Sequence, residues 1–352
     1  MITIQSKLIE RMKNTEDISL VEIFGDDFMD DSNKKGMDIK DKLSEIELDI
    51  KDVKNLGFSY TSTKEVPSRG DTVLTFEKGE DKKGKEIETC VLFVDIRNSV
   101  QLNEEHSPNT MGKIYTAFTK SMLKIAKYHS GEVRNIIGDR VMIVFPTENC
   151  TENAVECAIS INHISKIMNK VFSDVDFRCG IGIDYGKMRV IKVGIIRQGD
   201  NNVENKNLVW IGKPANIASR LTDIANKEID FVRVKYEMIT HNYLDPIIKA
   251  VPFFSYNGKS YVHSENEKKE YEDFLSCDSF FKPPFSDKYN FFGAKILSLK
   301  IEKQAIPPIL ITENVYDRLS PSIRDYFNEQ KNIDVKNNLK KVYGANLKWK
   351  QK

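Results

Sequence analysis

The sequence lacks long apolar runs, clustered metal-binding side chains and any excess of one charge. No apolar segment approaches the roughly 18 to 20 residues that a membrane span requires, and the N-terminus lacks the apolar region of a signal peptide. The five cysteines and five histidines are scattered, which argues against a zinc site and favours reduced thiols. A net charge of +1 shows no general nucleic-acid-binding surface. We therefore expect a cytoplasmic protein with no membrane span and no nucleic-acid partner.

The length of 352 residues is enough for about two domains. Residues 1–87 are predicted to comprise an N-terminal helical segment and a linker. The charged run EKGEDKKGKE, residues 77–86, is expected to be a linker or an exposed turn. Residues 88–265 mix predicted strands and helices and are the candidate catalytic domain. Residues 266–352 are rich in aromatics and then basic, and we predict an appended subdomain of unknown role. Within it, the tail from 309 to 352 is expected to be helical.

Apolar residues recur at steps of three and four between Asp38 and Asn55. This spacing predicts an amphipathic helix or a short coiled-coil seam. The stripe can pack on its own domain or contact a second chain, and the sequence leaves both open. Its members are Leu43, Ile46, Ile50 and Val53.

A short apolar run meets a carboxylate at two places in the chain. The run ETCVLFVDIR is typical of a core strand that ends at Asp95, and Asp139 opens the apolar run from Val141 to Phe145. A buried carboxylate is costly unless it is paired or binds a metal. The two strands are predicted to meet as a hairpin and to hold divalent metals between them. The alternative is a structural role, in which each aspartate caps a turn or pairs with a lysine.

Two further groups of polar residues suit phosphate chemistry. Arg97 and Ser99 belong to a polar turn whose free backbone N–H groups would face phosphate oxygens. A helix beginning at Pro214 carries Asn216 and Arg220, which are four residues apart and share one face. Paired metals about 4 Å apart can activate an attacking oxygen, and an arginine can stabilise the charge that develops on the phosphate. The set is typical of phosphoryl or nucleotidyl transfer.

Helices and strands alternate around these motifs. Ser107 and Pro108 suit the cap and first position of a helix, which Gly131 would end. A strand is expected at FVRV, residues 231–234. Three glycines lack the spacing of a dinucleotide-binding fingerprint and are expected to let elements pack closely on the sheet; they are Gly180, Gly182 and Gly186.

Three segments together resemble the catalytic core of the class III nucleotidyl cyclases. They are FVDIRNS, NIIGDRVMIVF and WIGKPANIASRL, in this order, and the resemblance covers about residues 88–240. It implies an α+β fold with a sheet related to the ferredoxin-like palm and flanked by helices. It also implies a homodimer with active sites at the subunit interface.

The resemblance assigns roles by position. Asp95 and Asp139 match the metal-binding aspartates, and Ile96 would lend its backbone carbonyl to one of two Mn²⁺ or Mg²⁺ ions. Asn216 would orient the ribose, and Arg220 would stabilise charge at the α-phosphate. The 3′-hydroxyl attacks that phosphorus, pyrophosphate leaves, and a 3′,5′-cyclic nucleotide results.

The base-reading positions depart from both purine patterns. Adenylate cyclases of this class use a lysine four residues before the second metal aspartate, and an aspartate or threonine three before the glycine of the last motif. Guanylate cyclases place glutamate and cysteine there. This chain has Asn135 and Val209 instead. Because asparagine both donates and accepts while valine does neither, neither purine should be recognised in the usual manner.

The upstream stretches FSYTSTKEVPSR and ETCVLFVDIRNSV make the chain similar to the pyrimidine cyclases of the Pycsar anti-phage systems. That resemblance implies conversion of UTP or CTP into cyclic UMP or cyclic CMP, a preference for manganese, and a product that acts on a separate effector protein. Tyr60 or Phe58 would stack on the small base, or both are ordinary core aromatics. Two alternatives remain: an adenylate cyclase with atypical base contacts, and a catalytically inactive nucleotide-binding regulatory module.

Overall fold

The computed structural model describes residues 39–76, 82–194, 206–238, 255–256, 259–260, 269–276, 294–330, 333 and 341–350. The chain divides into two compact units. The smaller unit comprises residues 1–58 and 77–82, and the larger one comprises residues 59–76 and 83–352. The aromatic-rich stretch predicted after residue 276 lies largely outside the described residues.

Helix α3 spans Ile39–Asn55 in the smaller unit, which confirms the helix predicted there. No residue of α3 is buried. The four residues of its apolar stripe are between 42% and 63% exposed. The described part of the chain therefore leaves this stripe uncovered.

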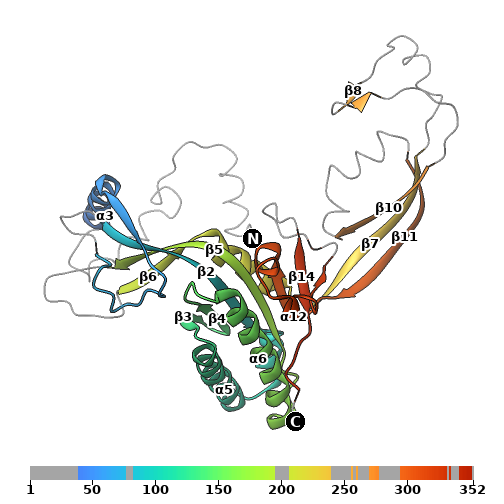
Figure 1. The fold of residues 1–352 in the computed structure, drawn as a ribbon, viewed down its shortest axis with the longest axis horizontal. Coiled ribbons are helices and arrows are strands. Elements are labelled where there is room, and N and C mark those ends of the chain that lie inside the picture. The colour runs from blue at the N-terminus through green and yellow to red at the C-terminus, as the bar shows by residue number, and fades with distance from the viewer. Residues whose placement is uncertain are drawn as a thin grey trace, which may run out of the picture. The chain divides into compact units, whose positions relative to one another are not determined.

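The larger unit is built on a nine-stranded sheet with the order β13-β14-β12-β5-β2-β4-β3, to which β1 adds beside β2 and β6 beside β5 (Figure 1). Its long central strands, β2 and β5, run antiparallel. The strands are β1 Phe58–Ser62, β2 Lys82–Ile96, β3 Glu132–Ile137, β4 Arg140–Val144, β5 Cys179–Gly194, β6 Lys206–Ile211, β12 Ile309–Thr312, β13 Asn328–Glu329 and β14 Val342–Ala345.

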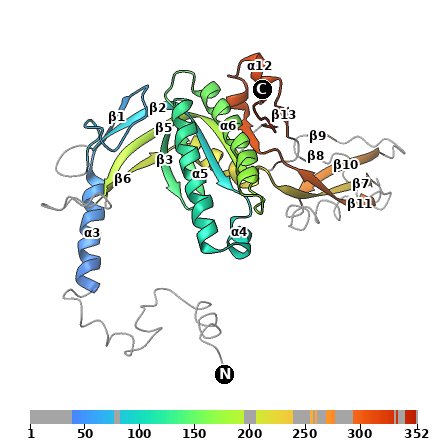
Figure 2. The same ribbon diagram turned by 90° about the horizontal axis from the view of Figure 1, so that it is seen from below.

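Helices cover both faces of this sheet. On one face, α5 (Pro108–Tyr128) and α6 (Cys150–Val171) lie side by side (Figure 2) and share a core with Leu92 of β2. Successive strand residues point to opposite faces. Val91 accordingly packs on the other face against α7 (Lys213–Ile224). The predicted cap of α5 is confirmed, because Ser107 Oγ accepts from the Thr110 backbone N–H at 3.2 Å.

Glycines allow α7 to lie directly on β5. A Cβ atom on Gly182 would lie 2.2 Å from the carbonyl oxygen of Ala218, and one on Gly180 would lie 2.7 Å from the carbonyl oxygen of Ala225. Real side chains never approach backbone this closely, so only glycine fits at these positions. The prediction that these glycines permit close packing is confirmed.

Smaller elements complete the described chain. A separate three-stranded sheet has the order β10-β7-β11, and its strand β7 confirms the strand predicted at FVRV. The remaining elements are α4 Ser99–Glu105, β7 Glu228–Met238, β8 Ser255–Tyr256, β9 Lys259–Ser260, β10 Lys269–Ser276, β11 Ala294–Ala305, α11 Glu313–Tyr316 and α12 Pro321–Arg324. No helix in the described ranges is long and apolar enough to cross a membrane.

Two of the expected segments are wrong. The charged run 77–86, expected to be a linker or exposed turn, contains the start of β2, which begins at Lys82. The tail predicted to be helical contains the buried strands β12 and β14, and its helices are only four residues long. Because β12 pairs in parallel with β5, this part of the tail continues the sheet of the cyclase motifs. Short apolar runs such as ILIT fit a helix or a strand by periodicity alone, and pairing with a distant strand decides between them.

One buried acid is built into the sheet. Asp184 of β5 is 1% exposed, and its carboxylate accepts from Thr312 Oγ1 at 2.6 Å. Burial raises its pKa to about 6, despite the hydrogen bonds from Thr312 and the Tyr185 backbone, which lower it. The folded state thus holds a proton that the unfolded chain releases near its ordinary value of 3.8. This group contributes stability below about pH 4 that is lost as the pH rises through about 6.

Asp184→Asn should therefore raise the free energy of unfolding at pH 7 by up to about 3 kcal/mol, since it removes the cost of a buried charge. The same substitution should flatten the dependence of stability on pH between about 4 and 6. Urea unfolding of both proteins across this range measures the effect. Parallel pH profiles for the two proteins would contradict it.

Candidate active site

Asp95 lies near the end of β2 on the face that α7 covers. Its neighbour in β5 is Gly180, and the absence of a side chain there leaves room for the groups around the carboxylate. The side chain of Asp95 is 15% exposed. Most of the side chain is therefore covered by the protein, and a small part of it reaches solvent.

Asp139 occupies the turn between β3 and β4. Ile137 pairs with Arg140 across a two-residue turn whose first residue, Gly138, has a φ of 60°, as tight hairpins require. Because β4 pairs with β2, with Val141 opposite Val94, the turn reaches the end of β2. The predicted meeting of the two carboxylate-bearing segments is confirmed, although β2 and β4 are adjacent strands and the hairpin itself is β3–β4.

Both carboxylates raise the pKa of a nearby thiol. Cys179 is fully buried at the start of β5, and burial raises its pKa to about 12. The negative charges of Asp95 and Asp139 contribute to the same rise. Both carboxylates therefore lie near the start of β5.

Two arginines neutralise Asp95 within the chain. Its Oδ2 atom accepts from Arg97 Nη2 at 3.0 Å and from Arg140 Nη2 at 2.9 Å. Arg97 is only 4% exposed, and its backbone N–H donates to the carbonyl of Arg178 at 2.8 Å. The prediction of a free N–H at Arg97 is wrong, because the turn continues the pairing of β2 with β5. Ser99, the other residue predicted in this turn, opens α4.

Arg140 is a residue of this site that the sequence motifs did not single out. It also donates to Ser219 Oγ at 2.9 Å and pairs with Asp223, both on α7. Burial lowers its pKa, but the hydrogen bonds that Arg140 donates to Asp95 and Asp223 outweigh burial and raise the pKa overall. Arg140 thus ties the Asp139 turn and Asp95 to α7. The sequence did contain a signal for Arg140, because this basic residue lies between the aspartate of a turn and a buried apolar run.

Arg140→Ala is expected to lower the free energy of unfolding of the metal-free protein by about 1.5–3 kcal/mol, because Asp95 and Asp223 lose a charged hydrogen-bond donor. Arg189→Ala is the matched control, since Arg189 pairs with Glu86 at the surface, where an ion pair contributes little. Urea unfolding in chelator measures both. Equal losses in the two variants would contradict the bridging role of Arg140.

The two helical candidates lie on the exposed face of α7. The buried face of that helix is formed by Pro214, Ile217, Ala218, Leu221 and Thr222. Asn216 and Arg220 are both exposed, so the predicted shared face is confirmed. These side chains project outward, where a ligand or a second chain can reach them.

The three candidate base-pocket residues do not converge within one chain. Asn135 is exposed on β3 opposite Met142, on the face that α7 covers. Val209 is 39% exposed on β6 opposite Ile191, on the other face. Tyr60 shares the face of Val209, because its ring lies over Gly84 and beneath Arg189, whose Cζ is 5.3 Å from the ring centre. A pocket containing all three would need residues from two chains.

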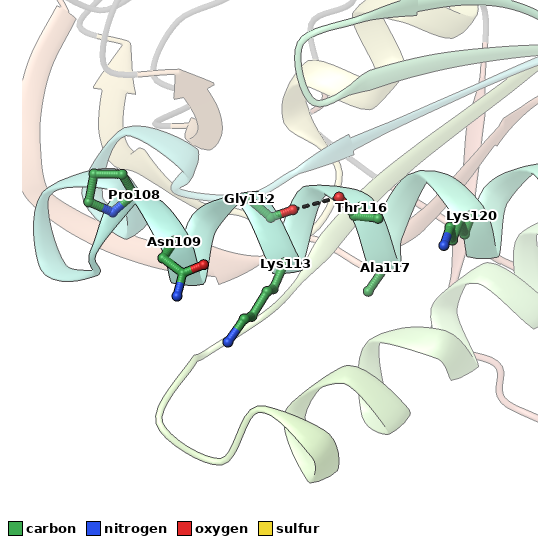
Figure 3. A pocket seen from close by; sticks show the side chains of 7 residues that line it. All are labelled: Pro108, Asn109, Gly112, Lys113, Thr116, Ala117 and Lys120. Carbon is green, nitrogen blue, oxygen red and sulfur yellow. Dashed lines mark hydrogen bonds between the residues drawn. The ribbon is translucent and has the colours of Figure 1, made fainter.

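A shallow hollow lies on the outer side of α5, away from these residues. Asn109, Lys113 and Lys120 project from the helix there, and Thr116 Oγ1 donates to the Gly112 carbonyl at 2.7 Å (Figure 3). None of the predicted site residues lines it. The hollow therefore plays no part in the carboxylate site.

Comparison with known families decides what this arrangement is. Residues 82–271, more than half of the chain, match the family described as the adenylate and guanylate cyclase catalytic domain. The chain belongs to this family. The resemblance to the class III cyclases and the expected α+β fold are thereby confirmed, and the activity of the family is nucleotidyl cyclisation, a phosphorus–oxygen lyase reaction.

Several curated relatives of this cyclase have the name uridylate cyclase. The protein from Burkholderia cepacia is 32% identical over 47% of this chain and 70% of its own length. The protein from Gulbenkiania mobilis is 26% identical over 70% of this chain and 88% of its own length. The catalytic core of a rhodopsin-guanylyl cyclase is a solved structure with 14% identity and a TM-score of 0.43, covering 74% of this chain and 98% of that one. The uridylate cyclase names agree with the resemblance to pyrimidine cyclases.

The oxygen donors of the site suit the divalent cations that cyclases of this family use. Asp95 and Asp139 supply carboxylates, and Ile96, which follows Asp95 in the chain, has a backbone carbonyl; Mg²⁺ and Mn²⁺ prefer such ligands. Among the described residues, no three His, Cys, Asp or Glu side chains form a metal-binding cluster. Two carboxylates suit a cation whose remaining coordination positions are filled by water and by substrate phosphates. Arg97 and Arg140 would then have to release Asp95.

Proposed function

We propose that this cyclase converts a pyrimidine nucleoside triphosphate, with UTP preferred over CTP, into its 3′,5′-cyclic monophosphate and pyrophosphate. The observation that supports this most is the meeting of Asp95 and Asp139 beside α7, which carries Asn216 and Arg220. The uridylate cyclase name of four relatives supports the choice of base.

Each proposed catalytic residue acts on a defined part of the substrate. Asp95, Asp139 and the Ile96 carbonyl would hold two Mn²⁺ or Mg²⁺ ions, which activate the 3′-hydroxyl and neutralise the triphosphate. Asn216 fixes the ribose so that this hydroxyl faces the α-phosphorus. Arg220 donates to the α-phosphate oxygens, where negative charge increases as pyrophosphate leaves.

The base pocket is proposed to use Asn135, Val209 and Tyr60, with Arg97 and Ser99 near the phosphates. Val209 offers no hydrogen bond, so a purine that needs one there leaves a polar group unpaired at a cost of about 1–3 kcal/mol. A smaller pyrimidine leaves room for Tyr60 to stack on it. The amide of Asn135 can pair with either uracil or cytosine by rotating.

The active enzyme is proposed to be a homodimer with sites shared between chains. The exposed positions of Asn216 and Arg220, and the two sheet faces that carry Asn135 and Val209, support a site completed by a second copy. The uncovered stripe of α3, with its steps of three and four, suits a helix pair in the same dimer. We further propose that the cyclic nucleotide activates a separate effector protein in bacterial anti-phage defence, in the cytoplasm.

The purified chain, offered ATP, GTP, CTP or UTP separately with MnCl₂, tests this function. Cyclic UMP should form fastest, followed by cyclic CMP. An adenylate cyclase with atypical contacts would make cyclic AMP instead, and an inactive regulatory module would bind a nucleotide without turnover.

A further inference from the structure

A second pocket, of about 310 Å³, opens at the end of the main sheet, between α6, the residues just before β5 and the C-terminal segment. Its floor is formed by Asn162 and Ser165 of α6, Phe177 before β5, and Pro308 before β12, all of which are buried. It shares no residue with the candidate active site. The pocket is therefore a separate feature of the fold.

Cations surround the mouth of this pocket. Lys166, Arg178 and Lys348 line it, and no carboxylate does. Arg178 uses Nε to contact Asp176 at 3.1 Å, so its two terminal nitrogens remain outside that contact. Over the ranges that the structure describes, neither lysine has a carboxylate partner. Three positive side chains around one hollow create a potential that attracts an anion.

The floor of the pocket adds polar groups that can form further hydrogen bonds. Ser165 is 7% exposed, and its Oγ atom has no conventional hydrogen-bond partner among the described residues. The Cys179 thiol lies beside it but is a weak partner. Asn162 Nδ2 donates to Asn346 Oδ1 at 3.0 Å, and Asn226 Nδ2 donates to the Cys179 carbonyl at 2.9 Å, so in the described part of the chain the oxygens of these two amides remain as acceptors. A buried hydroxyl without a partner destabilises the fold, and a ligand that hydrogen-bonds to it would remove that cost.

We propose that this pocket binds a phosphate ester of nucleoside monophosphate size. The phosphate lies between Lys166, Arg178 and Lys348, and the uncharged part of the ligand meets the amides and Ser165 on the floor. Small-molecule sites span about 300–1,000 Å³, so the volume of about 310 Å³ suits a monophosphate and excludes larger cofactors.

The pocket is joined to the carboxylate site through backbone. The carbonyl of Arg178 accepts from the N–H of Arg97, whose guanidinium binds Asp95. Asn226, which also lines the pocket, follows α7 directly. A ligand that fixes Arg178 therefore acts on Arg97, which binds Asp95. A ligand that fixes Asn226 acts on the end of α7, the helix that carries Arg220.

Calorimetric titration of the full chain with uridine 5′-monophosphate, in chelator, tests the proposal. One ligand per chain is expected. The double variant Lys166→Glu, Lys348→Glu should bind about tenfold or more weakly, because charge reversal opposes the phosphate. Lys170→Glu, an exposed substitution on the same helix outside the pocket, should bind like the wild type. Arg220→Ala should also bind normally, which separates this site from the triphosphate site.

Ser165→Ala provides a second, milder variant and should weaken binding severalfold while leaving the circular dichroism spectrum unchanged. Inorganic phosphate is titrated in parallel and should bind more weakly than the monophosphate. Absence of binding to the wild type, unchanged affinity in the double lysine variant, or equal affinity for inorganic phosphate would each overturn the proposal. None of these results depends on which triphosphate the enzyme cyclises.

Discussion

Asp139→Ala is expected to reduce cyclase turnover by about a thousandfold or more, because it removes one of two carboxylates that hold the catalytic cations. Metal ions stabilise several kcal/mol of charge in phosphoryl chemistry, and two carboxylates leave no spare ligand. The turn that carries Asp139 is exposed at Gly138 and ends before the buried strand, so the fold should persist. Product formation at saturating MnCl₂ measures the effect.

Asp174→Ala is the matched control, since Asp174 is an exposed aspartate after α6, and it should retain wild-type turnover. Circular dichroism and size-exclusion chromatography check that both variants fold and assemble alike. Substantial turnover by Asp139→Ala would remove this residue from the metal site and with it the two-metal assignment.

Arg220→Ala is expected to lower kcat by about 10³-fold with a smaller change in KM, because its guanidinium acts on charge that develops as pyrophosphate leaves. Lys213→Ala, an exposed substitution on the same helix, should leave kcat unchanged. Steady-state kinetics with UTP distinguish the two variants. A rise in KM at constant kcat would assign Arg220 to ground-state binding only.

The same two variants test whether the site is shared between chains. Asp139→Ala and Arg220→Ala, unfolded together and refolded at equal amounts, should recover about a quarter of wild-type activity, since about half the dimers are mixed and each has one intact site. Each variant refolded alone should stay inactive. If the mixture recovers no activity, Asp139 and Arg220 of the same chain belong to one site, which would contradict a site shared between chains.

Local pattern was enough to predict the carboxylate strands. The run up to Asp95 and the run after Asp139 are apolar, and each has a carboxylate at one end. This signal depends only on neighbours in sequence. The shared face of Asn216 and Arg220 is predictable for the same reason, because helical spacing alone determines it.

Long-range contacts account for what the sequence did not show. Arg140 matters through Asp223 and Ser219, which lie on α7 some eighty residues later, and no local rule links them. The strand β12 forms because β5 offers it an edge, so a run such as ILIT cannot be assigned without its partner. Val209 and Asn135 occupy opposite faces because of the register of β5 with β6, which pattern alone does not determine.

A competition assay tests the central claim most directly. ATP, GTP, CTP and UTP are supplied together at equal concentrations with MnCl₂, and the cyclic products are separated by mass. We predict cyclic UMP as the main product, cyclic CMP as the second, and purine products at trace levels, all absent with Asp139→Ala. Cyclic AMP or cyclic GMP as the main product would contradict the account.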